Sequence, residues 1–162
     1  MEGRSRLGFI KHVKIIQTKN WYAPPTTAKE WIAVANERAA DAEAIKKAIK
    51  KEKPSAVGSV YMAGYAIECS LKALLQSRGT PFPKHGQEGH NLHGLWEASK
   101  FKLSDLSDEK GTKTFFIEHW NTALRYEISC ESTLEVAELV DGARQLTGWI
   151  QSKLRRQLRK RR

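Results

Sequence analysis

Apolar residues recur along most of the chain at intervals of three and four, the spacing of an amphipathic helix. The clearest case lies within residues 55–78. One stripe there consists of Val57, Tyr61, Gly64, Glu68, Leu71 and Leu75. A second apolar row beside it consists of Val60, Ala63, Ile67 and Leu74. A helix that is apolar over so wide an arc is expected to lie in the core.

Caps and breakers divide the chain into five expected helices. Thr27 and Glu30 have the spacing of a capping box, and Gly79 follows the central helix as a C-cap. Ser132 and Glu135 form a second possible box. The expected helices cover about residues 27–53, 55–78, 90–100, 112–128 and 132 onwards into the C-terminal residues. Sustained strand-type alternation is absent from the sequence, although residues 13–17, VKIIQ, could form a short strand. The pattern predicts an all-α antiparallel bundle of four to five helices.

The central helix carries many small residues, including Gly58 and Gly64. A glycine inside a helix costs about 1 kcal/mol in propensity. Close packing of neighbouring helices against these positions would offset that cost.

Glu68 lies within the apolar stripe, where an ionised carboxylate requires a partner or takes up a proton. Lys72 is a local partner, four residues on in the same helix. Arg125 is a partner from the predicted helix 112–128, where it shares a polar face with Glu118 and Asn121 (or Thr122). We favour Arg125, because its planar fork pairs with a carboxylate through two bonds. A structural tie between helices is favoured over a chemical role for Glu68.

Positive charge is concentrated at the C-terminus of the chain. The net charge is +10, and the last ten residues carry seven basic groups, so the remainder carries only +3. These basic residues are Lys153, Arg155, Arg156, Arg159, Lys160, Arg161 and Arg162. They either attract polyanions such as RNA or form a solvated helix end. We therefore divide the chain into a basic extension (1–25), a bundle (26–151) and a basic tail (152–162).

The composition bears on the cellular environment. The longest apolar runs fall well short of the roughly 20 residues that span a bilayer. Charged residues interrupt the apolar start of the chain, which argues against a secretory signal and leaves a mitochondrial-type presequence open. The two cysteines belong to no CxxC motif. Reduced thiols in the cytoplasm are the simplest interpretation.

Motifs for cofactor or metal chemistry are weak. His85, His90 and His93 lie close together, but no HExxH motif or cysteine pair supports a metal site. His90 is expected to cap or pack the third helix. The sequence lacks the phosphate-binding and nucleophile motifs of common enzyme classes. We therefore expect no metal and no cofactor.

Three blocks, YMAGYAIECSLKALL, GHNLHGLWEA and WNTALRYE, together resemble the HEPN family over about residues 28–150. The resemblance implies a bundle of four or five helices and a homodimer with a cleft at its interface. Many HEPN proteins are metal-independent ribonucleases of toxin–antitoxin or defence systems. Others are inactive or are partners of nucleotidyltransferases.

The ribonuclease signature of that family is an arginine, four to six residues, and a histidine. Arg125 matches the arginine, but Cys130, Glu131 and Ser132 occupy the histidine positions. Cleavage through the RNA 2′-hydroxyl requires a proton acceptor near neutral pH, which histidine supplies. Arg78 and His85 also fit the spacing, but they flank a loop, so we attribute that match to chance.

These observations predict a domain that binds RNA or a nucleotide phosphate, with a degenerate ribonuclease site. The expected binding residues are Glu68, Asn121, Arg125 and Tyr126. Trp120 could also stack on a base, although packing in the core is favoured. An active ribonuclease that uses His119 or His85 is one alternative. A non-catalytic module that binds a partner protein is another.

Overall fold

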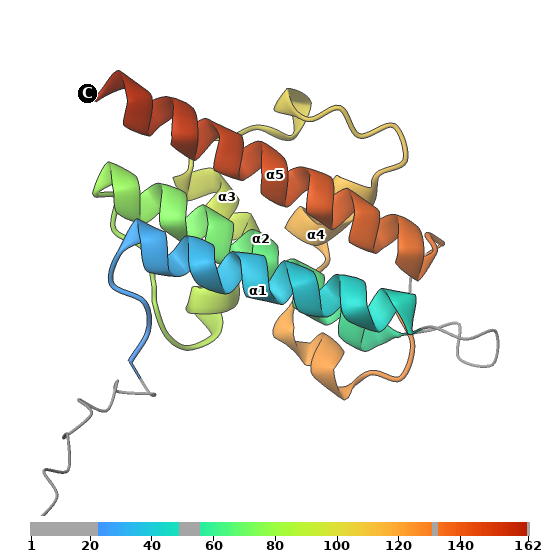
Figure 1. The fold of residues 1–162 in the computed structure, drawn as a ribbon. Coiled ribbons are helices and arrows are strands. Elements are labelled where there is room, and N and C mark those ends of the chain that lie inside the picture. The colour runs from blue at the N-terminus through green and yellow to red at the C-terminus, as the bar shows by residue number, and fades with distance from the viewer. Residues whose placement is uncertain (1–22, 49–55, 131–132, 162) are drawn as a thin grey trace, which may run out of the picture.

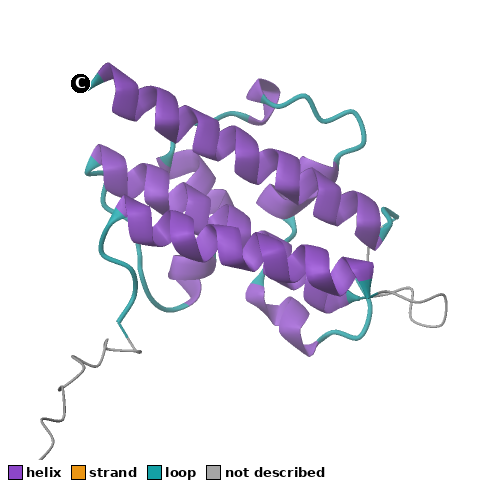
Figure 2. Ribbon diagram, in the orientation of Figure 1, coloured by secondary structure: helices purple, strands orange, loops and turns teal. Residues whose placement is uncertain are grey.

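A computed structural model describes residues 23–48, 56–130 and 133–161. Its α-helices are α1 (Ala28–Lys47), α2 (Val57–Arg78), α3 (Leu92–Ala98), α4 (Thr112–Glu118) and α5 (Val136–Lys160) (Figure 1). Three short 3₁₀ helices are η1 (Gln87–His90), η2 (Leu103–Asp105) and η3 (Thr122–Tyr126). The described residues contain no strand (Figure 2), which confirms the all-α prediction. The strand considered at 13–17 lies outside the described residues.

Local sequence signals set several helix ends as expected. The Glu30 amide donates to the Thr27 hydroxyl over 3.2 Å, and the Thr27 amide donates to the Glu30 carboxylate over 3.1 Å. These two bonds form the predicted capping box at the start of α1. Gly79 ends α2 in the left-handed conformation, at φ 68°.

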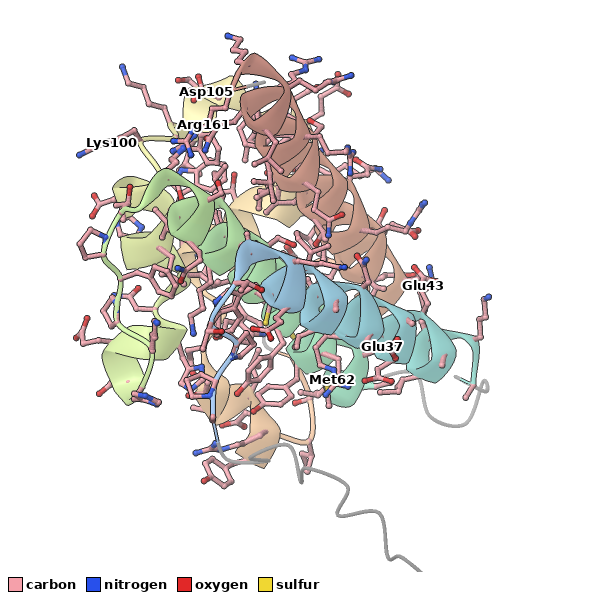
Figure 3. All side chains as sticks on the ribbon, turned by 60° about the vertical axis from the view of Figure 1, so that its left-hand side comes forward. Glu37, Glu43, Met62, Lys100, Asp105 and Arg161 are labelled. Carbon is pink, nitrogen blue, oxygen red and sulfur yellow. The ribbon has the colours of Figure 1, made fainter. Side chains whose placement is uncertain are left out.

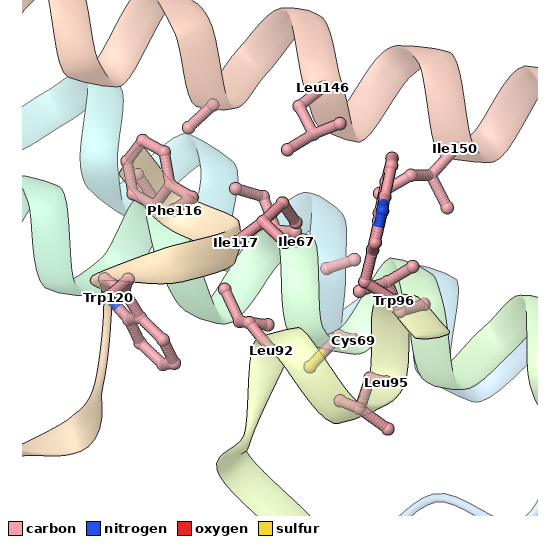
Figure 4. Packing of buried hydrophobic residues seen from close by; sticks show 14 of the residues in the cluster. Ile67, Cys69, Leu92, Leu95, Trp96, Phe116, Ile117, Trp120, Leu146 and Ile150 are labelled. Carbon is pink, nitrogen blue, oxygen red and sulfur yellow. The ribbon is translucent and has the colours of Figure 1, made fainter. Parts of the chain in front are cut away.

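The central element is α2, which packs against α1, α5, α3 and η3. Figure 1 shows α1 and α5 running along α2, with the short α3 and α4 behind them. The interior is continuous across these elements (Figure 4). Its fully buried side chains include Ile67, Leu71, Leu92, Phe116, Ile117, Leu146 and Ile150. Because α1, α5, α3 and η3 cover α2 on several sides, packing of the core determines which side chains of α2 remain near the surface.

Small residues allow close approach at two places. A Cβ atom at Gly64 would lie 2.1 Å from the indole of Trp120, and one at Gly142 would lie 2.3 Å from the Thr112 hydroxyl. Glycine at these positions lets Trp120 lie flat on α2 and lets α4 approach α5. The expected role of small residues in α2 is confirmed at Gly64.

The fourth helix is much shorter than the sequence predicts. α4 ends at Glu118, and Asn121 then caps η3 by accepting a hydrogen bond from the Ala123 amide over 2.8 Å. The helix breaks because Trp120 turns into the core against Gly64 while Asn121 begins a new turn. The predicted helix 112–128, with its polar face of Glu118, Asn121 and Arg125, is therefore wrong.

Two other helix ends also differ from the prediction. The expected helix 90–100 is shortened to α3 (Leu92–Ala98), because Asn91 caps α3 by accepting from the Gly94 amide over 3.1 Å, while His90 belongs to η1. α5 begins at Val136 with Glu135 in the cap position. Ser132, the expected cap, lies outside the described residues. As expected, α5 continues into the basic residues at the C-terminus.

The two thiols are expected to react very differently. Burial, aided by the nearby Glu68 charge, raises the pKa of Cys69 to about 12, whereas Cys130 lies half-buried in a loop. Because the thiolate is the reactive form, a disulfide reagent at pH 8 should titrate one thiol in the folded protein and two in guanidinium. Cys130→Ser should abolish the native reaction, and rapid labelling of that variant would contradict the burial of Cys69.

Candidate functional site

Glu68 lies in the interior with two partners. Its side chain is 2% exposed, and its Oε1 accepts a hydrogen bond from Lys72 Nζ over 2.8 Å. His90 Nδ1 lies 3.0 Å from the other carboxylate oxygen, Oε2. An ionised carboxylate can only accept hydrogen bonds, so Nδ1 carries the hydrogen and donates it. Both carboxylate oxygens are thus occupied by side chains of α2 and η1.

Lys72 is as deeply buried as Glu68. Its side chain is 2% exposed, and Nζ lies 5.0 Å from the centre of the Trp31 ring. The ammonium thus has a carboxylate on one side and an aromatic ring on the other. The pair is an internal structure and not the surface pair that the spacing of four residues suggests.

The predicted pairing of Glu68 with Arg125 is wrong. Because α4 ends at Glu118, Arg125 leaves the helical register and lies on η3, exposed to solvent. Lys72 reaches the carboxylate from within α2 itself, and His90 reaches it from η1.

Arg125 instead belongs to a cluster of tyrosines. Its guanidinium carbon lies 4.8 Å from the ring centre of Tyr126, which is 75% exposed. Hydrogen bonds to Tyr126 and Tyr61 raise the pKa of Arg125. Arg125 is therefore a permanent, solvent-facing cation that rests on aromatic groups.

Two half-buried tyrosines connect Arg125 to His90. The Tyr61 hydroxyl donates to the Tyr65 hydroxyl over 3.4 Å, and burial raises the pKa of Tyr65. The rings of Tyr65 and His90 meet edge to face, with centres 5.7 Å apart. Trp120 packs against both tyrosines: its ring centre lies 5.6 Å from that of Tyr65 and 6.1 Å from that of Tyr61. Aromatic packing thus brings η3, α2 and η1 into one surface, although they are distant in sequence.

Two pockets of about 380 Å³ each meet at His90. The first, here called the α1–α2 pocket, has the Glu68–Lys72 pair in its wall, together with Trp31, Arg38, Tyr61, Tyr65, Lys84 and His90. The second, here called the η3 pocket, is lined among others by His90, His93, His119, Trp120, Asn121 and Ala123. Arg125 comes two residues after Ala123, the last residue in the chain that lines the η3 pocket.

The remaining predicted site residues occupy different places. Asn121 uses its side chain locally, since its amide also donates to the His119 carbonyl over 3.2 Å. His119 is exposed at the end of α4 and borders the η3 pocket, whereas His85 is exposed in a loop and lines neither pocket. Arg78 joins α2 to other elements by donating to the Ser99 carbonyl over 2.6 Å and to Gln157 over 2.9 Å. Arg78 therefore has a packing role.

The basic tail forms the exposed end of α5. Arg155, Arg156, Arg159 and Lys160 face solvent, while Arg161 donates to the Ser77 carbonyl over 2.6 Å. Lys153 lies over the Trp149 ring at 4.6 Å, and Arg162 lies outside the described residues. In Figure 3, Arg161 lies at the opposite end of the molecule from Met62, which borders the α1–α2 pocket. The tail is therefore a separate cationic surface.

Sequence reasoning missed the roles of Lys72 and His90. The spacing of four residues between Glu68 and Lys72 is visible in the sequence, but it does not reveal that both side chains are buried. No spacing signals the contact between Glu68 and His90, which come from separate elements. Among the described residues there is no group of three or more histidine, cysteine, aspartate or glutamate side chains placed to hold a metal ion. Within the same residues, no helix is both long and apolar enough to cross a membrane.

Residues 28–154 match the family model of the HEPN domain. The matched region includes α1 to α4, all three 3₁₀ helices and most of α5. Comparison with curated proteins and with solved structures gives no match.

Proposed function

Because the chain belongs to the HEPN domain family, whose members are associated with nucleotide and RNA binding and with ribonuclease activity, we propose that it binds RNA or a nucleotide phosphate beside Arg125. The observation that carries the proposal is the exposed guanidinium resting on the exposed Tyr126 ring. The guanidinium suits a phosphate, and the ring suits a base. Asn121 contributes by holding the turn that presents both.

We further propose that cleavage is weak or absent. The acid–base step requires a group such as histidine close to the bound phosphate. In this chain Cys130 follows Arg125 after four residues, and the next two positions are also not histidine. Arg125 alone supplies charge stabilisation without a proton acceptor.

An active ribonuclease is a second candidate, supported by one observation. His119 is exposed, lines the η3 pocket together with Asn121, and precedes Arg125 by six residues. His85 has no comparable position. Under this alternative, His119 takes the role of the missing histidine.

HEPN domains often form dimers, and we propose a homodimer for this chain too. A nucleotidyltransferase is the proposed partner if the domain proves to be an interaction module. The two free thiols are compatible with the reducing cytoplasm, where we place the protein.

Arg125→Ala should weaken binding of a single-stranded RNA about ten-fold or more. The variant removes a charged hydrogen-bonding group from a solvent-facing site, and such bonds contribute about 1.5–3 kcal/mol. Fluorescence anisotropy of labelled RNA in EDTA measures binding, and gel electrophoresis of the same samples measures cleavage. Arg144→Ala is the matched control, because Arg144 is an exposed arginine of α5 outside both pockets.

The tail requires its own control, since exposed cations bind phosphates without sequence preference. Truncation is unsuitable, because Leu154 is buried and Gln157 bonds to Ser77 and Arg78. A full-length variant with glutamine at 155, 156, 159 and 160 keeps the helix and removes four charges. Equal RNA binding by Arg125→Ala and the wild type would overturn the proposal. Cleavage that is lost in Arg125→Ala would support the ribonuclease instead.

A further inference from the structure

The α1–α2 pocket has the size of a small-molecule site. Its volume is about 380 Å³, and ligand pockets usually measure about 300–1,000 Å³. It opens between α1 and α2 and is closed on a third side by the chain around Lys84 and His90. The pocket lies next to the proposed Arg125 surface, because Tyr61 lines the pocket and also contacts Arg125.

The charge balance of this pocket favours an anion. Arg38, Lys84 and Lys72 supply three cations, and Glu68 is the one acidic residue among the described residues that line it. Lys72 lies 2.8 Å from Glu68, so the buried ammonium neutralises the carboxylate that would otherwise repel an anion. Arg38 is partly neutralised by Asp41 at 3.0 Å, whereas no carboxylate of the described residues forms an ion pair with Lys84.

His90 adds an oriented polar group. Its Nδ1 is fixed by Glu68 at 3.0 Å, and its Nε2 has no hydrogen-bond partner among the described residues. The side chain is one-third exposed and lines the pocket. A histidine whose ring is held by a carboxylate presents its second nitrogen in a defined direction. That nitrogen is available to a ligand.

The rest of the wall is aromatic and apolar. Trp31, Tyr61 and Tyr65 provide rings, and Val34, Met62 and Cys69 provide apolar contacts. Such a surface suits a flat ring, because nucleobases stack on aromatic side chains. Arg38 and Lys84 line the same pocket as these rings, so the pocket suits a ligand in which an aromatic ring is linked to a phosphate group.

We propose that the α1–α2 pocket binds a nucleoside monophosphate unit, either as a free nucleotide or at the end of an RNA. The base lies against Trp31, Tyr61 and Tyr65, and the phosphate is bound by Arg38, Lys84 and His90. This inference rests on the proposed function and adds to it, because it places one nucleotide in a defined pocket beside the Arg125 surface.

Calorimetry with three probes tests the proposal: adenosine monophosphate, adenosine, and inorganic phosphate. We expect the monophosphate to bind at least ten-fold more tightly than either of its parts, because only it uses both the rings and the cations. Arg38→Gln and Lys84→Gln should each weaken this binding about ten-fold. Lys29→Gln is the matched control, since Lys29 is an exposed residue of α1 outside the pocket, and it should leave binding unchanged.

The outcomes separate this inference from the proposed function. The pocket assignment is overturned, and the proposed function stands, if RNA binds through Arg125 but adenosine monophosphate does not bind. The same conclusion follows if adenosine monophosphate binds Arg38→Gln, Lys84→Gln and the wild type equally well. If neither adenosine monophosphate nor RNA binds, the pocket assignment and the proposed function both fail. A 5′-phosphorylated RNA tetramer identifies the source of the nucleotide: displacement of the monophosphate indicates an RNA end, and no displacement indicates a free nucleotide.

Discussion

Replacing Lys72 by methionine is expected to destabilise the fold by about 3–5 kcal/mol, the usual cost of removing one partner from a buried ion pair. Methionine fills much of the same volume, so the loss comes from charge and not from a cavity. Glu68 then retains only His90 as a partner, at a depth where its side chain is 2% exposed. Urea unfolding followed by circular dichroism measures the change in the free energy of unfolding. A Lys72→Met variant as stable as the wild type would contradict a structural role for the buried ion pair.

A double variant provides the matched control. Replacing Glu68 by leucine together with Lys72 by methionine removes both charges, and apolar replacements of buried pairs are often neutral or stabilising. His90 loses its acceptor but remains one-third exposed, so water can bond to its Nδ1. The double variant should therefore be more stable than Lys72→Met alone. If it is less stable, the carboxylate is not the source of the destabilisation.

Gly64→Ala and Gly148→Ala are expected to change stability in opposite directions. Alanine has a higher helix propensity than glycine by about 1 kcal/mol, so Gly148→Ala should stabilise α5, where a Cβ meets nothing within 4 Å. At Gly64 the added Cβ would lie 2.1 Å from the buried Trp120 ring. Displacing that ring costs about 1–3 kcal/mol of overpacking, which exceeds the propensity gain.

Coupling to Trp120 tests the cause of the Gly64 effect. Trp120→Leu alone creates a cavity and destabilises the protein, but it also makes room above Gly64. Gly64→Ala should therefore cost less in the Trp120→Leu background than in the wild type, with a coupling energy of about 1 kcal/mol or more. Thermal unfolding of the four proteins measures the coupling. Additive effects would show that another contact opposes the alanine side chain.

Local patterns in the sequence were sufficient for the helices and for part of their packing. The spacing of three and four residues placed Glu68 within the buried stripe of α2, and the structure confirms its burial. The capping box at Thr27 and the glycine at 79 also formed as expected. These features depend on residues within about one turn of each other, so the sequence alone determined them.

Only the tertiary structure decided which side chain neutralises Glu68 and where α4 ends. The helical spacing allows Lys72 as the partner, whereas pairing geometry favours an arginine from elsewhere in the chain. Which cation pairs with Glu68 depends on the distances between elements and on the side chains that enclose Lys72, especially Trp31. In the same way, α4 ends because Trp120 packs on Gly64, more than 50 residues earlier in the chain. That packing leaves Arg125 in solvent, while His90, from η1, reaches the buried carboxylate. Contacts of this kind arise from the summed packing of the whole core, and no local spacing of residues encodes them.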